Sequence, residues 1–216
     1  AYRPSRGLQM LSLMQHSRRP LPWRYNSYRL VLILEDMRNL WSDRQRWRQY
    51  LGILFLIVLV LVGEPVRGLF YLGLVLVLLG IAARLWASGH VKKNQVLATS
   101  GPYAYVRHPL YVGNHLIALG YCLASSLWWS LPAWVALALM FYPHAIRDED
   151  HRLAQRFPAE WNEWSRSTKA LIPRLSPYAP SGRGSWSFAQ SWRENGEPVI
   201  AALLLLGLFV LQQKLP

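Results

Sequence analysis

The feature that most constrains the fold of this chain is a set of uninterrupted apolar blocks. The stretches GILFLIVLVLVG and AALLLLGLFVL contain no polar side chain at all. Charged residues make up only 16% of the chain, below the roughly 25% of soluble domains. Such blocks indicate membrane-spanning helices, although several are shorter than the roughly 20 residues that a bilayer needs and rely on tilt or thinning. The candidate spans are Tyr50–Gly63, Leu69–Ala83, Pro109–Leu123, Leu127–Ile146 and Pro198–Leu211.

Positive charge is spread around these blocks. The formal net charge is +13, and 22 of the 24 Lys and Arg residues lie in residues 1–50, 84–109 and 147–196. Because cations are enriched on the cytoplasmic side of membrane spans, the pattern predicts a cytoplasmic N-terminus, a C-terminus outside and anionic inner-leaflet lipids as partners. It argues against a nucleic-acid partner, since no single basic module is present. We expect an integral protein of a bacterial inner membrane.

The five apolar blocks predict an all-α, polytopic membrane helical bundle of about five transmembrane helices. The polar, Pro- and Gly-containing residues between the blocks divide the chain into segments. Residues 173–196, rich in Pro, Ser and Gly, are typical of a loop. The expected segments are a basic N-terminal segment with an interfacial helix (1–49), a transmembrane hairpin (50–83), a core with a cytoplasmic loop, a second hairpin and a charged cytoplasmic helix (84–175), a loop (176–197) and a C-terminal transmembrane helix (198–216).

A first polar cluster, SGPYAYVRHPLYVG, occupies residues 100–113 between apolar runs. Gly101-Pro102 predicts a turn, and Pro109 fits the first turn of a helix, where its missing N–H costs nothing. Helical spacing then places polar side chains on one face that enters the membrane, and polar residues there are candidates for a site. That face and its neighbours include His108, Tyr111, Asn114 and His115.

A second polar cluster, RDEDHR, occupies residues 147–152 at the cytoplasmic end of the fourth block. A solvated helix end is the alternative interpretation, because Asp148 and Arg152 have the spacing of an ordinary ion pair. The single cysteine, Cys122, has no partner for an intrachain disulfide, and no Cys/His spacing typical of a metal site is present. The two clusters together predict a cavity, open to the cytoplasm, that suits a polar cofactor and a lipid-borne substrate.

Two blocks of sequence carry a resemblance to a known family. LATSGPYAYVRHPLYVG is similar to a pattern with Leu, then Gly-x-Tyr, then Arg-His-Pro-x-Tyr-x-Gly. EDHRLAQRFPAEWNEW, followed by IPRL, is similar to a pattern with two acids, spaced Leu, Phe and aromatic positions, and a Pro-containing end. In their order and spacing these blocks, which span residues 84–175, resemble the isoprenylcysteine carboxyl methyltransferase and phospholipid N-methyltransferase superfamily.

The resemblance implies an enzyme that uses S-adenosyl-L-methionine to methylate a lipid or small amphiphile, on a carboxylate or an amine. Glu149 would pair with the ammonium of the cofactor, and Arg107 would either bind its carboxylate or order the loop. Catalytic roles are implied for Arg107, His108 and Glu149, and substrate contacts are expected for Asn114, His115 and Arg147. The implied cofactor-binding residues are Gln95, Val96, Leu97, Ala98, Tyr103, His108, Pro109, Leu110, Tyr111 and Glu149.

The chain departs from the family pattern at three positions. Asp150 stands where the family often has Glu, and Phe157-Pro158 replaces the usual Phe-Gly. Ala145 stands where the prenylcysteine enzymes carry an arginine that contacts substrate, which argues against a prenylcysteine carboxylate as the acceptor. Two other functions stay open: a membrane NADPH-dependent reductase of the sterol-reductase type, and a non-enzymatic membrane protein that keeps the fold.

Overall fold

The computed structural model describes residues 46–91, 96–178 and 186–216. The chain divides into two compact units, residues 1–47 and 48–216. The first unit, including the predicted interfacial helix, lies almost entirely outside the described residues. The helices and the site treated below belong to the second unit.

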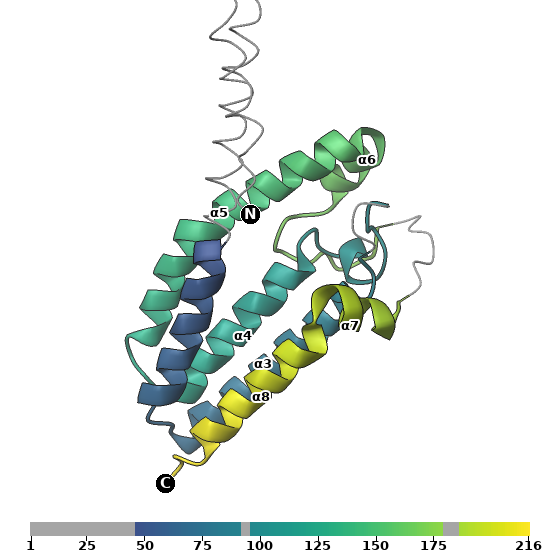
Figure 1. The fold of residues 1–216 in the computed structure, drawn as a ribbon. Helices are drawn as coiled ribbons and strands as arrows, with labels where there is room; N and C mark the ends of the chain where they lie inside the picture. Colours follow the sequence, from purple (N-terminus) through teal and green to yellow (C-terminus); the bar gives the residue numbers. More distant parts are fainter. Residues whose placement is uncertain (1–45, 92–95, 179–185) are drawn as a thin grey trace, which may run out of the picture. The chain divides into compact units, whose positions relative to one another are not determined.

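The described residues of the second unit are helical and contain no strand, which confirms the all-α class (Figure 1). The first helical segment covers residues 48–62, and a short 3-10 helix, η1, covers Gly101–Ala104. Each predicted membrane block falls on a helix. The remaining helices are α3 (Arg67–Ser88), α4 (Pro109–Ser125), α5 (Ser130–Arg156), α6 (Pro158–Ser167), α7 (Phe188–Asn195) and α8 (Glu197–Gln212).

Glycines bring α3 and α4 together as antiparallel neighbours. Gly73 faces Gly120, and Gly80 faces Gly113, so that a methyl group added at any of the four positions would meet backbone of the other helix within 3 Å. Small residues at seven-residue spacing on both helices therefore allow their backbones to approach closely, as in packed membrane helices. This pair forms the rigid centre from which the loop before α4 emerges.

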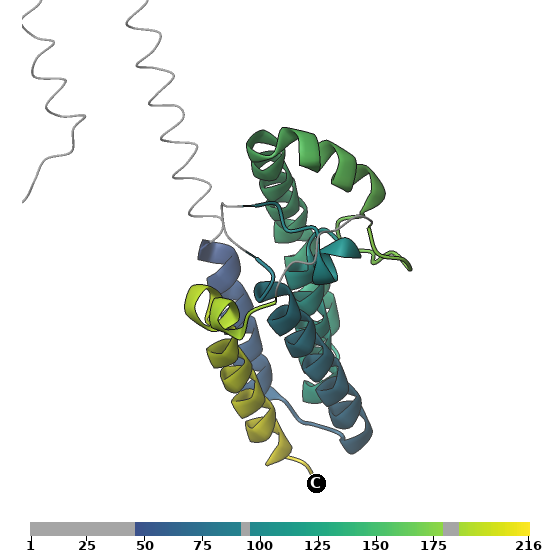
Figure 2. The same ribbon diagram turned by 90° about the vertical axis from the view of Figure 1, so that its right-hand side faces the viewer.

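The C-terminal helix α8 packs beside α3 and α4, and segments distant in sequence lie side by side there (Figures 1 and 2). Its Leu204, Leu208 and Leu211 join a buried cluster with Leu59 of helix 48–62 and Tyr121 of α4. The Tyr121 hydroxyl donates to the carbonyl of Leu204. A buried phenol needs such a partner, because leaving its polar group unpaired would cost stability.

Proline and glycine set the ends of the elements as the sequence predicts. Pro109 occupies the first turn of α4, and Pro158 begins the short helix α6 after α5 ends. Gly101 has a φ of +58°, and a methyl group there would lie within 2.6 Å of the His90 ring. A residue without a side chain is therefore required at the start of η1.

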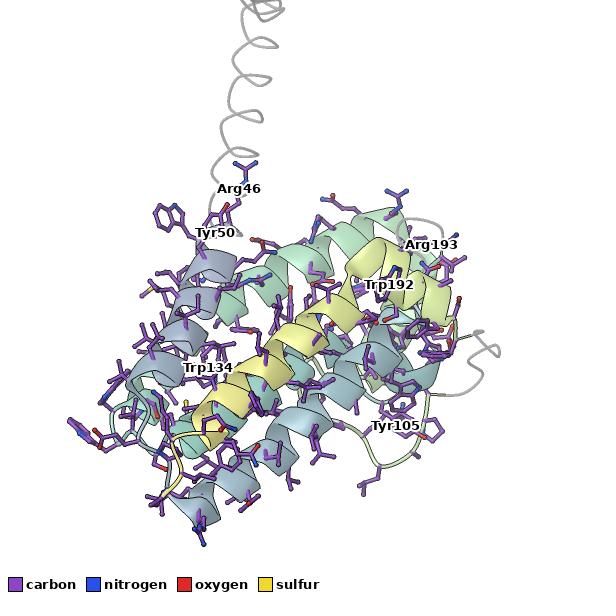
Figure 3. All side chains as sticks on the ribbon, turned by 60° about the horizontal axis from the view of Figure 1, so that its bottom comes forward. Arg46, Tyr50, Tyr105, Trp134, Trp192 and Arg193 are labelled. Carbon is purple, nitrogen blue, oxygen red and sulfur yellow. The ribbon has the colours of Figure 1, made fainter. Side chains whose placement is uncertain are left out.

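The segment expected to be a loop, residues 173–196, differs in part from that expectation, because α7 covers Phe188–Asn195. The Ser187 side chain accepts from the Gln190 N–H at the start of this helix, and Gly196, with a φ of +62°, ends it. These are strong capping signals. The sequence did not reveal this helix because α7 is short and mostly polar, so it resembles the surrounding loop. Trp192 and Arg193 project from α7 (Figure 3).

Among the described helices, α3 is long and apolar enough to cross a membrane, and α8 is apolar but shorter. Much of the apolar surface of these two helices is exposed, including Leu72, Leu79, Leu203 and Leu206. The prediction of about five membrane spans goes beyond this finding and stays a prediction.

Candidate functional site

The two polar clusters of the sequence lie against each other. Nε2 of His108, the residue before α4, is 2.8 Å from Oδ1 of Asp150 in α5. The Tyr111 hydroxyl donates to Oε2 of Glu149 over 2.8 Å. The expectation that residues around the Arg-His-Pro triplet meet the acidic end of the fourth block is therefore confirmed as geometry.

His108 is held between the two acids. Its side chain is almost fully buried, and Nδ1 lies 3.7 Å from Oε2 of Glu149 while Nε2 faces Asp150. The imidazole also stacks on the Tyr111 ring, with 5.3 Å between centroids and 15° between planes. A proton on Nε2 therefore has Asp150 as its acceptor, whereas Nδ1 lies near Glu149 but beyond hydrogen-bond distance.

Arg107 connects the loop to α5 and α6. Its Nη2 is 3.4 Å from Oδ2 of Asp150, and its guanidinium lies over the Trp161 ring at 5.5 Å. Its backbone N–H donates to the Lys169 carbonyl over 2.9 Å. Within the described residues its buried Nε has no hydrogen-bond partner. Of the two roles expected for Arg107, the geometry shows the ordering of the loop and leaves one donor available.

The loop that carries His108 is fixed by the chain after α6. The Trp164 indole, from α6, donates to the Tyr103 carbonyl over 3.0 Å. Residues 104–108 also pair backbone to backbone with residues 169–178. These bonds run from His108 N to Ala170 O (3.1 Å), from Arg174 N to Tyr105 O (3.0 Å) and from Tyr178 N to Ala104 O (2.8 Å).

Tyr103, in η1, has a buried side chain. Burial raises the pKa of its phenol well above the usual range, and the negative charges of Glu149 and Glu197 raise the pKa further. The phenol therefore stays neutral and serves as a hydrogen-bonding group.

An aromatic group lies beneath the two acids. The Tyr142 ring of α5 packs edge-on against the Tyr111 ring at 5.3 Å and lies 4.3 Å from the His115 ring. Arg48 reaches this group from helix 48–62, with its guanidinium 5.2 Å from the Tyr111 ring centroid and a 3.3 Å hydrogen bond to the Tyr111 hydroxyl. Trp134, labelled in Figure 3, packs edge-on against the His115 and Tyr142 rings and stacks on Phe55 at 6.0 Å.

A second polar network lies deeper in the bundle. Arg84 of α3 donates from Nε to Oε2 of Glu197 over 3.0 Å and from Nη2 to Oε1 over 2.7 Å. Its Nη1 donates to Oδ1 of Asn114 in α4. The side chains of Arg84 and Glu197 are 15% and 6% exposed, so this pair is mostly shielded from solvent.

The structure brings together only some of the predicted site residues. Arg147 is exposed on α5, and within the described part no hydrogen bond or ion pair joins it to Glu149. Asn114 accepts a hydrogen bond from Arg84, and His115 packs against the Tyr142 ring. Leu97, Ala98 and Leu110 pack against the apolar cluster around Tyr103 and Trp164, Pro109 is buried, Val96 is exposed, and Gln95 lies outside the described residues.

Sequence reasoning missed Arg48, Arg84, Tyr142 and Glu197. Arg48 lies in an Arg/Trp-rich segment that is also typical of a lipid headgroup zone, so it carried no separate signal. Glu197 did carry one, because it is an acid at the start of an otherwise apolar helix. Arg84, at the polar end of α3, is the complementary charge, but only the fold shows that the two meet. Among the described residues no group of His, Cys, Asp or Glu has the arrangement of a metal site.

The fold and the paired blocks define a class of protein. The sequence pattern of the family described as phospholipid methyltransferase matches residues 67–160, which contain both polar clusters. This match, which covers less than half of the chain, supports the superfamily of phospholipid and isoprenylcysteine methyltransferases for residues 67–160. Glu197 and α8 lie outside the matched residues.

Three curated proteins are similar to the chain. The cobalt-zinc-cadmium resistance protein CzcN of Cupriavidus metallidurans is 41% identical over 145 residues, 64% of this chain and 63% of that protein. The nickel-cobalt-cadmium resistance protein NccN of Alcaligenes xylosoxydans xylosoxydans is 40% identical over 109 residues, 48% of this chain and 49% of that protein. The protein-S-isoprenylcysteine O-methyltransferase of Schizosaccharomyces pombe is 34% identical over 88 residues, 38% and 35% of the two chains.

The chain thus spans less than two thirds of each of these relatives. The first two are named for resistance to metal ions and for no reaction, whereas the third is named as a methyltransferase. No solved structure matches the chain.

Proposed function

We propose that the chain is a membrane methyltransferase that uses S-adenosyl-L-methionine to methylate a lipid or small amphiphile. The observation that carries this proposal is the junction of two distant motif blocks, in which His108 and Tyr111 meet Asp150 and Glu149. A solvated helix end would not require a buried histidine and a tyrosine hydroxyl as partners for its acids.

The residues present fit this cofactor chemically. The Glu149 side chain is 36% exposed and offers a carboxylate to an ammonium group. The guanidinium of Arg48 lies over the Tyr111 ring, so this aromatic group accommodates a positive charge beside Glu149. The unpaired Nε of Arg107 is a donor for a carboxylate. When bound, S-adenosyl-L-methionine supplies a methyl group that is already activated on its sulfonium.

The residues of the chain would mainly position the reactants and exclude water. Asp150 orients His108, and His108 and Glu149 fix the Tyr111 ring from two sides. A carboxylate acceptor needs no base. An amine acceptor must lose a proton, and Glu149 or the nearby Nδ1 of His108 would take it.

We further propose that the second unit is a bundle of about five membrane spans, with the site on the cytoplasmic side. The exposed apolar surface of α3 and α8 and the arginines flanking the helices support this arrangement. The acceptor would enter from the bilayer between helices, and the cofactor would enter from the cytosol. The basic flanks would bind anionic lipids of the inner leaflet.

The test is methyl transfer by the full chain in lipid nanodiscs, with methyl-labelled S-adenosyl-L-methionine and a total lipid extract of the expression host. We expect a labelled product with the native chain and with Glu160→Ala, a control at an exposed acid of α6. We expect none with Glu149→Ala. A product that persists in Glu149→Ala, or no product with any chain, would contradict the proposal. Oxidation of NADPH by the native chain would favour a reductase instead.

A further inference from the structure

The deep network of Arg84, Asn114 and Glu197 is not required by the general packing of the helices. A buried ion pair is weak evidence for stability, because apolar residues of similar size often replace it without loss. The cost of desolvation is high for both charges, and Glu197 is 6% exposed. Polar residues placed inside an apolar bundle are candidates for a site by default.

The backbone around this network is shaped to admit Arg84. A methyl group at Gly113 would lie 2.6 Å from Cγ of Arg84, so the stem of this arginine crosses α4 over the glycine. Gly113 is the last residue of the motif block HPLYVG. The glycine therefore allows Arg84 to reach Asn114, the next residue on α4.

The network is continuous with the site proposed for the cofactor. Asn114 is followed in α4 by His115, whose ring lies 4.3 Å from the Tyr142 ring, and Tyr142 packs on Tyr111, whose hydroxyl donates to Glu149. We call the group of His108, Tyr111, Glu149 and Asp150 the first wall and the group of Arg84, Asn114 and Glu197 the second wall.

From this geometry we propose that Glu197 is a positioning residue for the methyl acceptor, an assignment that rests on the proposed function. By holding Arg84 from α8, it fixes Asn114 in the second wall, which the polar headgroup of the amphiphile contacts. The C-terminal helix, outside the residues that match the family, is then part of the site. Because Glu149 lies on the other wall, the cofactor is bound independently of Glu197.

The test compares Glu197→Gln with the exposed-acid control Glu64→Gln. Cofactor affinity is measured by calorimetry, and the apparent KM for acceptor is measured against the concentration of the host lipid extract. We expect Glu197→Gln to raise the apparent KM about tenfold and to leave cofactor affinity within about twofold. Equal KM values in the two variants, or a parallel loss of cofactor affinity, would overturn the assignment.

A second variant separates positioning from folding. Arg84→Met combined with Glu197→Leu removes both charges, and we expect it to keep the melting temperature of the native chain while showing the same raised KM. Full activity in this double variant would mean that the pair has no positioning role. If Glu197→Gln unfolds, the double variant decides the question. If the native chain neither binds S-adenosyl-L-methionine nor transfers methyl, the proposed function fails and this assignment fails with it.

Discussion

The two charged walls of the site use the same chemistry in different surroundings. Near the loop, Glu149 and Asp150 are 36% and 21% exposed and are paired with the residues around His108. Between α3 and α8, Glu197 is 6% exposed and holds Arg84 through two hydrogen bonds. The first wall is accessible to a ligand from solution, whereas the second is closed by helices. This difference in exposure is the reason why we assign the soluble cofactor to the first wall and the membrane-borne acceptor to the second.

The largest effect is expected from removing the His108 imidazole, which lies next to both acids of the first wall. We expect His108→Ala to lower the rate of methyl transfer about 100-fold, because Glu149, Asp150 and Tyr111 all lose a partner. His144→Ala, at an exposed position of α5, is the matched control. Initial rates with labelled cofactor check the prediction, and equal rates in the two variants would refute it.

A methyl group at Gly113 would strain the second wall. Gly113→Ala places Cβ 2.6 Å from Cγ of Arg84 and 2.9 Å from the Gly80 carbonyl, and we expect a loss of about 1–3 kcal/mol in the free energy of unfolding. Gly52→Ala is the control, since a methyl group there meets nothing within 4 Å. Thermal unfolding in nanodiscs compares the two variants. A Gly113→Ala variant as stable as Gly52→Ala would mean that Arg84 does not cross α4 at this point.

The hydroxyl of Tyr111 sharpens the comparison at the level of one hydrogen bond. Tyr111→Phe keeps the ring but removes the donor to Glu149 and the acceptor for Arg48, and we expect cofactor affinity to fall about fivefold to tenfold. Tyr71→Phe, at an exposed position of α3, should leave it unchanged. Calorimetric titration measures both variants, and an undiminished affinity in Tyr111→Phe would show that the cofactor does not depend on this bond.

The smallest effect is expected at Arg48, which contacts the Tyr111 ring and hydroxyl. Arg48→Gln should weaken cofactor binding about twofold to threefold, in line with a cation–π contact worth roughly 0.5 kcal/mol. The same titration checks it. A loss of cofactor affinity as large as that of Tyr111→Phe would contradict this ranking and would mean that Arg48 contributes as much to cofactor binding as the Tyr111 hydroxyl.

The sequence predicts the helices and the first wall well because both depend on local signals. Apolar blocks mark the helices, and Pro109 and Pro158 mark where two of them begin. The Arg-His-Pro triplet and the acids at 149 and 150 stand out from their surroundings, and the family pattern relates them to each other.

The second wall could not be predicted because its residues are far apart in the sequence and form no local motif. Arg84 and Glu197 are more than 100 positions apart, and each alone resembles an ordinary charge at a helix end. Arg147 illustrates the opposite case: proximity to Glu149 in sequence suggested a role, but helical geometry places its side chain on an exposed face of α5. Pairings across helices depend on how the helices pack. The close approach of α3 and α4 requires glycines on both helices, so neither helix alone reveals it in the sequence.

The most direct measurement is calorimetric titration of S-adenosyl-L-methionine into the native chain, Glu149→Ala and Glu160→Ala in nanodiscs. If the two motif blocks form the wall that binds the methyl donor, the native chain and Glu160→Ala bind it with similar affinity and Glu149→Ala does not. Equal binding by Glu149→Ala, or binding of NADPH in place of S-adenosyl-L-methionine, would contradict that assignment.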